Sequence, residues 1–239
     1  MKMKKIFALA AAAVLLLPMT SCFVRINNES IRKLNKGQVV GNGVLVSDRR
    51  SLDAFDDLAL EGGIDVRFVQ ADVDPYMDIE VSENLLPFLK SEVKDGVLTV
   101  RFYSDTLSSY TIGQHSLTIY APKLSSVGIL GSGDFTCESL STEGEFDLSM
   151  AGSGDIKLAG LHCQGLDIAI AGSGDIKADA QVEGAVSVSI AGSGDVVLSG
   201  RAGSADYSIA GSGDIDVRNL EVSGPVNQSV FGSGDIRTR

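Results

Sequence analysis

Large apolar residues alternate with small or polar ones over much of the second half of the chain. Phe146, Leu148 and Met150, for example, are separated by Asp147 and Ser149. A period of two is typical of a β-strand that buries one face. The pattern therefore predicts a series of β-strands, each with an apolar side that another element must cover.

The alternation is organised around a four-residue motif, Gly-Ser-Gly-Asp, whose successive copies start 21, 20, 20, 19 and 21 residues apart. After each copy the alternation resumes for a shorter run, and a further glycine recurs before the next strand. Each unit is predicted to consist of a strand, a tight turn, a shorter strand and a looser turn. The six copies occupy residues 131–134, 152–155, 172–175, 192–195, 211–214 and 232–235.

A single unit of this kind cannot bury its apolar face, so it must stack on its neighbours. Translation by one strand spacing, roughly 4.8 Å, would place like side chains above one another in continuous ladders. This predicts an all-β fold, a parallel β-solenoid of about 20 residues per coil. We expect the solenoid to be right-handed, because crossover connections between parallel strands are nearly always right-handed. An antiparallel meander with Ser-Gly hairpin turns is the alternative, but it would leave its apolar face uncovered unless it closed into a barrel.

The residues of the motif suit a corner of such a coil. Glycine permits positive φ and close approach of backbones, and an Asp carboxylate accepts a hydrogen bond from a nearby backbone N–H. Stacked aspartates would form a file of like charges, so a Ca²⁺ site is a second interpretation; no other cofactor is expected. The turn glycines are Gly131, Gly133, Gly152, Gly154, Gly172, Gly174, Gly192, Gly194, Gly211, Gly213, Gly232 and Gly234, and the aspartates are Asp134, Asp155, Asp175, Asp195, Asp214 and Asp235.

A secretion signal is predicted at residues 1–21. Lys2, Lys4 and Lys5 precede an apolar run that is too short for a permanent transmembrane helix. The small residues before Cys22 are typical of a bacterial lipoprotein cleavage site. We therefore expect lipidation of Cys22 and firm anchoring to a membrane. An ordinary signal peptide with an incidental cysteine is the alternative.

The rest of the chain is predicted to be a lipidated polar tether, residues 22–38, followed by one continuous domain, residues 39–239. Residues 124–239 form the regular array. Residues 39–123 are β-rich with irregular turns, and we interpret them as an opening coil and cap, because the end unit of a solenoid must cover its open face.

Residues 55–66 are interpreted as a degenerate first coil. Strands at 77–81 and 116–121, one helical turn within 84–90 and a hairpin at 93–100 are expected after it. The overlay pairs Leu58 with Val127, Leu60 with Ile129, Gly62 with Gly131, Ile64 with Phe135 and Val66 with Cys137.

The last coil has no matching cap in the sequence. Alternation places Arg237 and Arg239 outward, where their charge discourages edge-to-edge strand pairing. Docking of a second copy on this end, giving a homo-oligomer, is the alternative.

Charge and cysteine content restrict the partners. The formal net charge is −11, and removal of residues 1–21, with three lysines and no acids, would make it −14. This acidity argues against nucleic acid and anionic lipid as partners. Cys137 falls at a buried strand position and Cys163 is expected to face outward, so no disulfide or metal site is predicted.

Catalytic chemistry has little support. The two histidines, His115 in a polar loop and His162 beside Cys163, have no spaced partners for zinc or a nucleophilic triad. Lys157 and Lys177 are interpreted as a solvated face. A polysaccharide-active enzyme is a less favoured alternative, because the outward rows are small and lack aromatic residues. Those rows are Asp147, Asp167, Ser187, Asp206 and Asn227, and Ser149, Ala169, Ser189, Ser208 and Ser229.

Several segments together resemble a known family. They are Phe55-x-x-Leu58-x-Leu60-x-Gly62, Glu83-Asn84-Leu85-Leu86, Asp95-Gly96-x-Leu98, Ala121-Pro122-x-Leu124 and the serial Gly-Ser-Gly-Asp units. Over residues 40–239 the chain resembles the head GIN domain family of auto-transporter adhesins, common as lipoproteins in Bacteroidetes-type bacteria. The resemblance implies a β-solenoid and a cell-envelope location.

These observations predict a lipid-anchored, non-enzymatic outer-membrane lipoprotein that presents a rigid, repetitive surface to a protein or glycan ligand. The regular outer face or the loop at 103–115 would be the contact. A structural envelope scaffold is the alternative, and the sequence leaves open whether the domain faces the periplasm or the cell surface.

Overall fold

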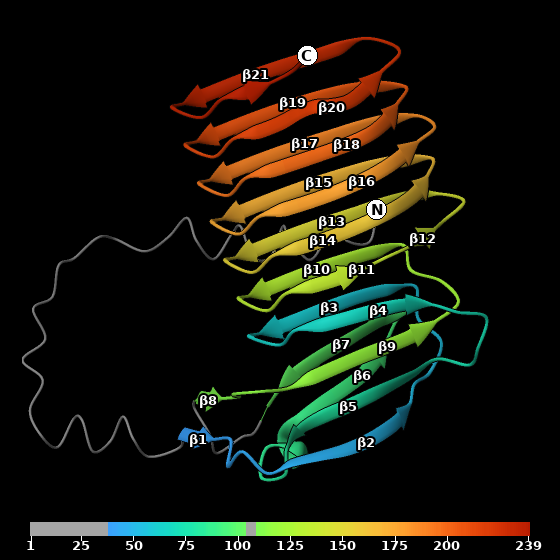
Figure 1. Cartoon of the computed structure of the whole chain (residues 1–239), viewed down its shortest axis with the longest axis vertical. Coiled ribbons are helices and arrows are strands. Elements are labelled where there is room, and N and C mark those ends of the chain that lie inside the picture. Colours follow the sequence, from blue (N-terminus) through green and yellow to red (C-terminus); the bar gives the residue numbers. More distant parts are fainter. Residues whose placement is uncertain (1–37, 104–108) are drawn as a thin grey trace, which may run out of the picture. The chain divides into compact units, whose positions relative to one another are not determined.

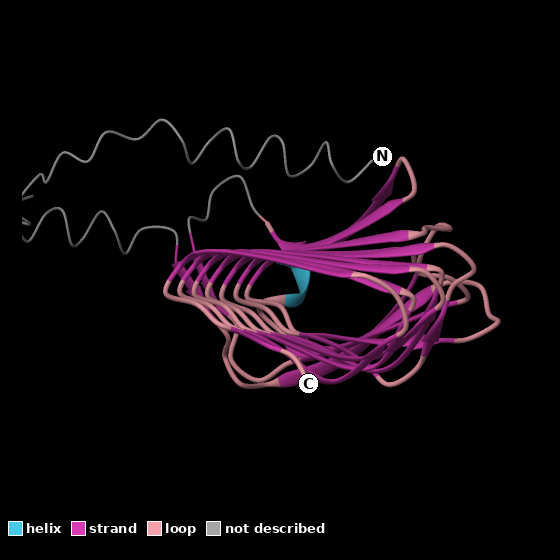
Figure 2. Cartoon of the chain, turned by 90° about the horizontal axis from the view of Figure 1, so that it is seen from above, coloured by secondary structure: helices cyan, strands magenta, loops and turns pink. Residues whose placement is uncertain are grey.

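Parallel pairing between neighbouring coils defines the architecture (Figure 1). The structure is a computed structural model and describes residues 38–103 and 109–239. Each Gly-Ser-Gly-Asp turn joins a strand of one sheet to a strand of a second sheet, and the chain then returns to the first sheet one strand further along. Seen along the stack, the two sheets face each other across the interior (Figure 2). The predicted parallel β-solenoid is confirmed, and the antiparallel meander is wrong.

The nine-stranded sheet contains the strand that precedes each tight turn. Its pairs are parallel, except for the β6–β7 hairpin at its edge. In spatial order its strands are β21 (Val226–Gly232), β19 (Ser204–Gly211), β17 (Ala185–Gly192), β15 (Gly165–Gly172), β13 (Glu145–Gly152), β10 (Ser126–Gly131), β3 (Asp57–Gly62), β7 (Val97–Phe102) and β6 (Leu89–Lys94).

The eleven-stranded sheet contains the strand that follows each tight turn. At the edge of this sheet that belongs to the cap, β5 pairs antiparallel with both β2 and β9. In spatial order its strands are β2 (Leu45–Ser51), β5 (Tyr76–Ser82), β9 (Ser116–Ala121), β4 (Val66–Gln70), β11 (Phe135–Cys137), β14 (Ile156–Cys163), β16 (Ile176–Val182), β18 (Val196–Ala202), β20 (Ile215–Val222) and β22 (Ile236–Arg237), with β12 (Leu140–Ser141) also paired to β14.

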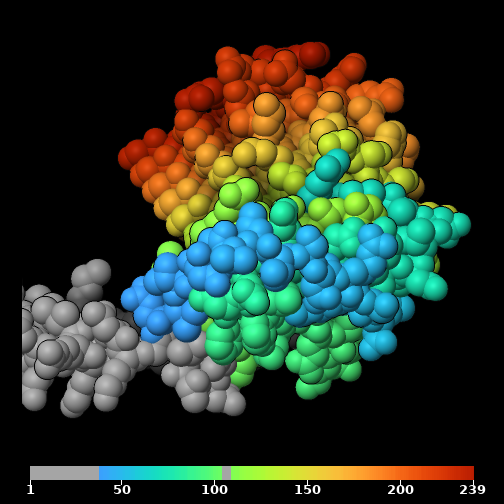
Figure 3. Space-filling model, turned by 60° about the horizontal axis from the view of Figure 1, so that its bottom comes forward, coloured from blue at the N-terminus to red at the C-terminus, as the bar shows by residue number. Residues whose placement is uncertain are grey.

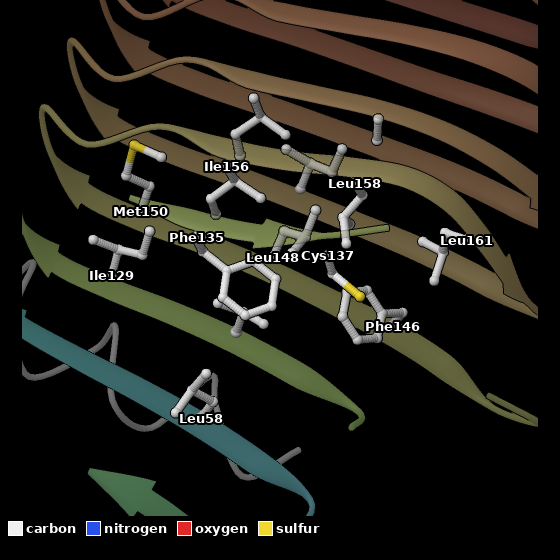
Figure 4. Packing of buried hydrophobic residues seen from close by; sticks show 14 of the residues in the cluster. Leu58, Ile129, Phe135, Cys137, Phe146, Leu148, Met150, Ile156, Leu158 and Leu161 are labelled. Atoms are coloured by element: carbon white, nitrogen blue, oxygen red, sulfur yellow. The ribbon is translucent and has the colours of Figure 1, made fainter. Parts of the chain in front are cut away.

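The apolar positions of both sheets point into the space between them (Figure 4). Like positions of successive coils lie beside one another, so that the core is a set of ladders along the stack. Full burial of one such side chain contributes about 1.5–3 kcal/mol, and this gain is repeated in every coil. One ladder is Leu58, Val127, Leu148, Ile168, Val188 and Tyr207, and the facing one is Val66, Phe135, Ile156, Ile176, Val196 and Ile215.

The cap covers one end of the regular array (Figure 3). It includes the hairpin β6–β7, whose turn residues Asp95 and Gly96 have φ of 52° and 80°. Positive φ at both central residues is the geometry that a two-residue hairpin favours. The 3₁₀ turn η1 (Leu86–Phe88) confirms the expected helical turn. A small parallel sheet joins β1 (Gln38–Val40) to β8 (Ser109–Thr111).

The first coil is confirmed, but the predicted register after its turn is wrong. Leu58 and Leu60 do pair with Val127 and Ile129. After the turn, however, Val66 pairs with Phe135, and Phe68 pairs with Cys137. The backbone runs through both turns with the same number of residues, so the buried Ile64 occupies the place of Gly133 rather than that of Phe135.

Cys163 is buried rather than outward. The register between β14 and β16 shifts between Leu158 and Leu161, which places Cys163 opposite the buried Val182. Counting residues from the Gly-Ser-Gly-Asp turn aligns Cys163 with the exposed Glu183 instead, because the sequence pattern does not reveal the extra residue of a β-bulge. Cys137 is buried as predicted, and both thiols are free.

The last described coil leaves core positions open. Every residue of β21 is exposed, including Val226 and Val230, which lie beside buried residues of β19. Arg237 forms ion pairs with Asp214 and Asp235. Association of two copies through this end stays a prediction.

Candidate functional site

The Gly-Ser-Gly-Asp corner requires both of its glycines. The first glycine of each copy has φ between 138° and 150°, a region that other residues rarely adopt. A Cβ on either glycine would also lie far inside contact distance of a backbone oxygen in the preceding coil, which for Gly154 is that of Gly133. The corner is therefore structural, and its glycines set how closely the coils stack.

The corner aspartates bind neighbouring coils to one another. In five of the six neighbouring pairs the backbone N–H of one Asp donates to the Oδ1 atom of the Asp before it, at 2.8–3.0 Å, and the pair Asp155 and Asp175 is the exception. These hydrogen bonds, here called the Asp ladder, give an acceptor to backbone N–H groups that the hydrogen bonds of the β-sheets do not pair. Within the described residues no group of three or more His, Cys, Asp or Glu side chains could hold a metal ion. The Asp ladder consists of Asp65, Asp134, Asp155, Asp175, Asp195, Asp214 and Asp235.

His115 occupies the start of this ladder. Its Nε2 atom accepts a hydrogen bond from the Asp65 amide at 3.0 Å, so Nδ1 carries the proton and donates to the Gly113 oxygen at 2.9 Å. The imidazole, 8% exposed, replaces the carboxylate that a preceding coil would supply. The sequence placed His115 in a polar loop without partners, and its role is structural.

We expect Asp195→Ala to lower the free energy of unfolding by about 1 kcal/mol, because the amide of Asp214 loses its acceptor. The loss stays at the low end because Asp195 is exposed and water can replace part of the bond. Asp195→Asn keeps an oxygen acceptor and should stay within about 0.5 kcal/mol of the wild type. Denaturant unfolding measures both. Equal destabilisation by the two variants would show that the charge matters, and not the hydrogen bond.

The outer face of the nine-stranded sheet is flat and built from small side chains. The two predicted rows are confirmed as in-register neighbours across β13 to β21. The pKa of Asp147 is raised by burial and by the carboxylates of Asp167 and Glu145. Such a surface has few groups that could recognise a ligand.

The outer face of the eleven-stranded sheet is chemically richer. Arg67, Thr136, Lys157 and Lys177 are neighbours on four consecutive strands, β4, β11, β14 and β16, and are here called the cation row. All four side chains are exposed. They line a depression of about 440 Å³ whose wall also includes Glu138 and Asp179.

A second depression, of about 430 Å³, lies further along the same strands. Its lining includes His162, Gln181, Arg201 and Glu221, which follow one another across β14 to β20. Arg201 donates to Gln181 at 2.7 Å. His162 is exposed while its neighbour Cys163 is buried, so the two side chains point to opposite faces.

Two features of this face were not predicted from the sequence. Arg67 was not assigned to the cation row because the first coil was overlaid two residues out of register. A constant offset from Gly62 and Gly131 would have placed it beside Thr136. The cap also contributes an aromatic pair, Tyr76 stacked on Tyr120 at 4.6 Å between ring centroids, which belongs to no repeat and left no periodic signal.

The described residues offer no activated nucleophile at this face. Burial raises the pKa of the Cys163 thiol to about 11 and also raises the pKa of Cys137, so both remain protonated at neutral pH. Arg218 lowers the pKa of Asp216 to about 2, first through its side-chain hydrogen bonds. This carboxylate is therefore an ion-pair partner and not a proton donor.

The family described as "Putative auto-transporter adhesin, head GIN domain" matches residues 54–186 and 180–239. The chain belongs to this family. The predicted resemblance is thereby confirmed, and the family description favours a binding role in the cell envelope over catalysis. No curated protein sequence matches this head GIN domain protein.

Solved structures share the fold of the head GIN domain. A protein from Parabacteroides distasonis named as a putative lipid binding protein is 23% identical, with a TM-score of 0.71 over 84% of this chain and 99% of its own. A putative adhesin from Bacteroides fragilis is 22% identical, with a TM-score of 0.68 over the same shares. At this level of identity the likeness establishes the architecture alone.

Two predictions for the head GIN domain protein concern residues that the structure does not describe. The signal peptide and the lipidated Cys22 are outside the described residues, and so are residues 104–108 of the loop that is expected to contact a ligand. Within 38–103 and 109–239, no helix is long and apolar enough to span a bilayer.

Proposed function

We propose that this protein is a non-catalytic adhesin of the bacterial cell envelope that binds its ligand on the outer face of the eleven-stranded sheet. The observation that carries the proposal is the in-register array of exposed side chains on that face, with two depressions among them. The ladders below hold each strand in place, so the surface is preorganised and little ordering entropy is lost on binding.

The chemistry of the described residues supports binding rather than turnover. His115 is engaged in the Asp ladder, both thiols are buried, and His162 lies on an exposed row without an activated nucleophile beside it. General acid–base or nucleophilic catalysis requires such partners within hydrogen-bond reach.

Anchoring at Cys22 is part of the proposal. The apolar run and the small residues before Cys22 support lipidation, and the following polar residues suit a tether between membrane and domain. An adhesin must also face outward, whereas an envelope scaffold would work inside the outer membrane. The flat, small-residue face of the nine-stranded sheet favours that second function, because it could pack against another flat surface.

Labelling of intact cells separates the two functions. An amine-reactive biotin reagent that cannot cross membranes should modify the wild-type protein on intact cells, because Lys157 and Lys177 are exposed. The Cys22→Ala variant should leave the membrane fraction and become soluble, since it cannot be lipidated. Labelling of the lysed sample provides the control for reactivity. Modification of the wild type only after lysis would contradict the adhesin and support the scaffold.

A further inference from the structure

The depression at the cation row has the construction of a binding site. Its lining includes the short side chains of Thr136, Ala159 and Ser199. The longer charged side chains of the cation row line it too, together with the carboxylates of Glu138 and Asp179. β14 has a bulge between Leu158 and Leu161, and a bulge bends its strand, so the sheet is not flat here.

The cations of the row differ in their partners. Arg67 contacts Glu138 at 2.8 Å, and Lys157 lies 3.4 Å from Asp155. Lys177 has no hydrogen-bond or ion-pair partner among the described residues. Exposed pairs of this kind contribute little to folding stability, so the side chains can turn toward a ligand at small cost. Lys177 is the cation most available to an anionic group.

The row is open along the stack. It continues on β9 as Thr118, beside Arg67, and on β18 as Val197, beside Lys177. From Arg67 to Lys177 it spans three strand spacings, about 14 Å. An extended chain could therefore enter and leave the depression along this direction.

The mixture of charges selects the chemistry of that chain. Lys157 and Lys177 suit carboxylates, and the oxygens of Glu138 and Asp179 accept hydrogen bonds from hydroxyl groups. A polymer of acidic sugars carries both groups in each repeat. Double-stranded DNA carries about one charge per 1.7 Å and would place phosphates close to Glu138 and Asp179, whereas an acidic sugar polymer has its carboxylates further apart with hydroxyl groups between them.

We propose that the cation row and its depression bind an acidic polysaccharide whose carboxylates meet Lys157 and Lys177 and whose hydroxyls meet Glu138 and Asp179. This names a ligand class for the face used in the proposed function and rests on that function.

Binding of polygalacturonate, a uronic acid polymer, to the full chain purified in detergent tests the proposal. The wild type should bind polygalacturonate more tightly than neutral dextran, and the affinity should fall as salt is added. We expect the double variant K157Q/K177Q to bind about tenfold more weakly, because two charge-assisted contacts are lost. The matched control K94Q/K123Q removes the same charge from exposed lysines outside the depression and should bind as the wild type. E138Q/D179N keeps hydrogen-bonding groups and should not weaken binding tenfold.

Equal binding by the wild type and K157Q/K177Q would overturn the proposal, and so would an equal loss in K94Q/K123Q. Thermal unfolding of each variant shows whether a loss of affinity reflects a loss of structure. Failure here is distinct from failure of the proposed function. A protein that is labelled on intact cells but does not bind polygalacturonate would remain an adhesin with another ligand. Shortening of the polymer during incubation would contradict the non-catalytic role and leave the binding site in place.

Discussion

Gly154→Ala is expected to lower the free energy of unfolding by about 3 kcal/mol, because the added Cβ has no space at the corner. It would meet the backbone oxygen, carbon and nitrogen of Gly133 in the preceding coil. Backbone atoms cannot rotate away as a flexible side chain can, so relief requires two coils to separate. In a domain of this size the loss corresponds to a fall in the unfolding midpoint of roughly 6 to 12 °C, which thermal denaturation measures.

Gly144→Ala provides the matched control for this substitution. Gly144 lies at the looser turn, and a Cβ there would meet nothing within 4 Å. We expect a change within about 0.5 kcal/mol. If Gly154→Ala unfolds at the same temperature as Gly144→Ala, the stability of the stacked coils does not depend on the close approach of their backbones at the corner.

Phe135→Ala should cost about 3–5 kcal/mol, because it removes the largest side chain of its ladder and leaves a cavity. Phe135 is fully buried, pairs with Val66 and Ile156, and lies 6.5 Å from Phe68 between ring centroids. It packs where the first coil meets the regular array. Denaturant unfolding, followed by circular dichroism, gives the loss.

The control is Phe231→Ala, which removes the same side chain from a position that is 75% exposed. Its effect on stability should stay within about 0.5 kcal/mol. A large loss at Phe231 with a small loss at Phe135 would mean that the ladders do not supply the stability of the solenoid.

The regular array could be predicted from the sequence because the pattern that forms each strand and the pattern that places it beside the next strand repeat with the same period. In each unit the alternation of apolar residues defines the buried face, and the corner glycines define where the chain turns. A parallel stack satisfies both at every copy, as with Leu148, Ile168 and Val188 in one ladder. A solenoid converts sequence periodicity directly into spatial neighbours.

The errors arose where the period is interrupted. The bulge in β14 shifts Cys163 by one position, which moves it from the outside to the core. The turn of the first coil places Ile64 where later coils have glycine, so matching apolar residues alone shifted Val66 and hid Arg67 from its row. Contacts of the cap, such as that between His115 and Asp65, connect residues far apart in sequence without any repeat.

The candidate site was predicted only in outline for the same reason. The outward positions of Lys157 and Lys177 follow from alternation, and the sequence suggested a solvated face. Their relation to Arg67 and to the carboxylates of Glu138 and Asp179 depends on strand register and on the bend in the sheet. Those features decide whether charged side chains are scattered or surround a depression.

The Gly-Ser-Gly-Asp corners are alike in successive coils, so a whole coil could be lost or gained during evolution without a change in the contacts between coils. Each coil contacts chiefly the coil before it and the coil after it. Deletion of residues 192–210 would join Ala191 to Gly211 and let the flanking coils form the same Gly, Asp and apolar contacts. Recombination between repeats can thus shorten or lengthen the solenoid in steps of about 4.8 Å. Such a deletion would remove one coil and leave the four residues of the cation row, which lie between Arg67 and Lys177, in place.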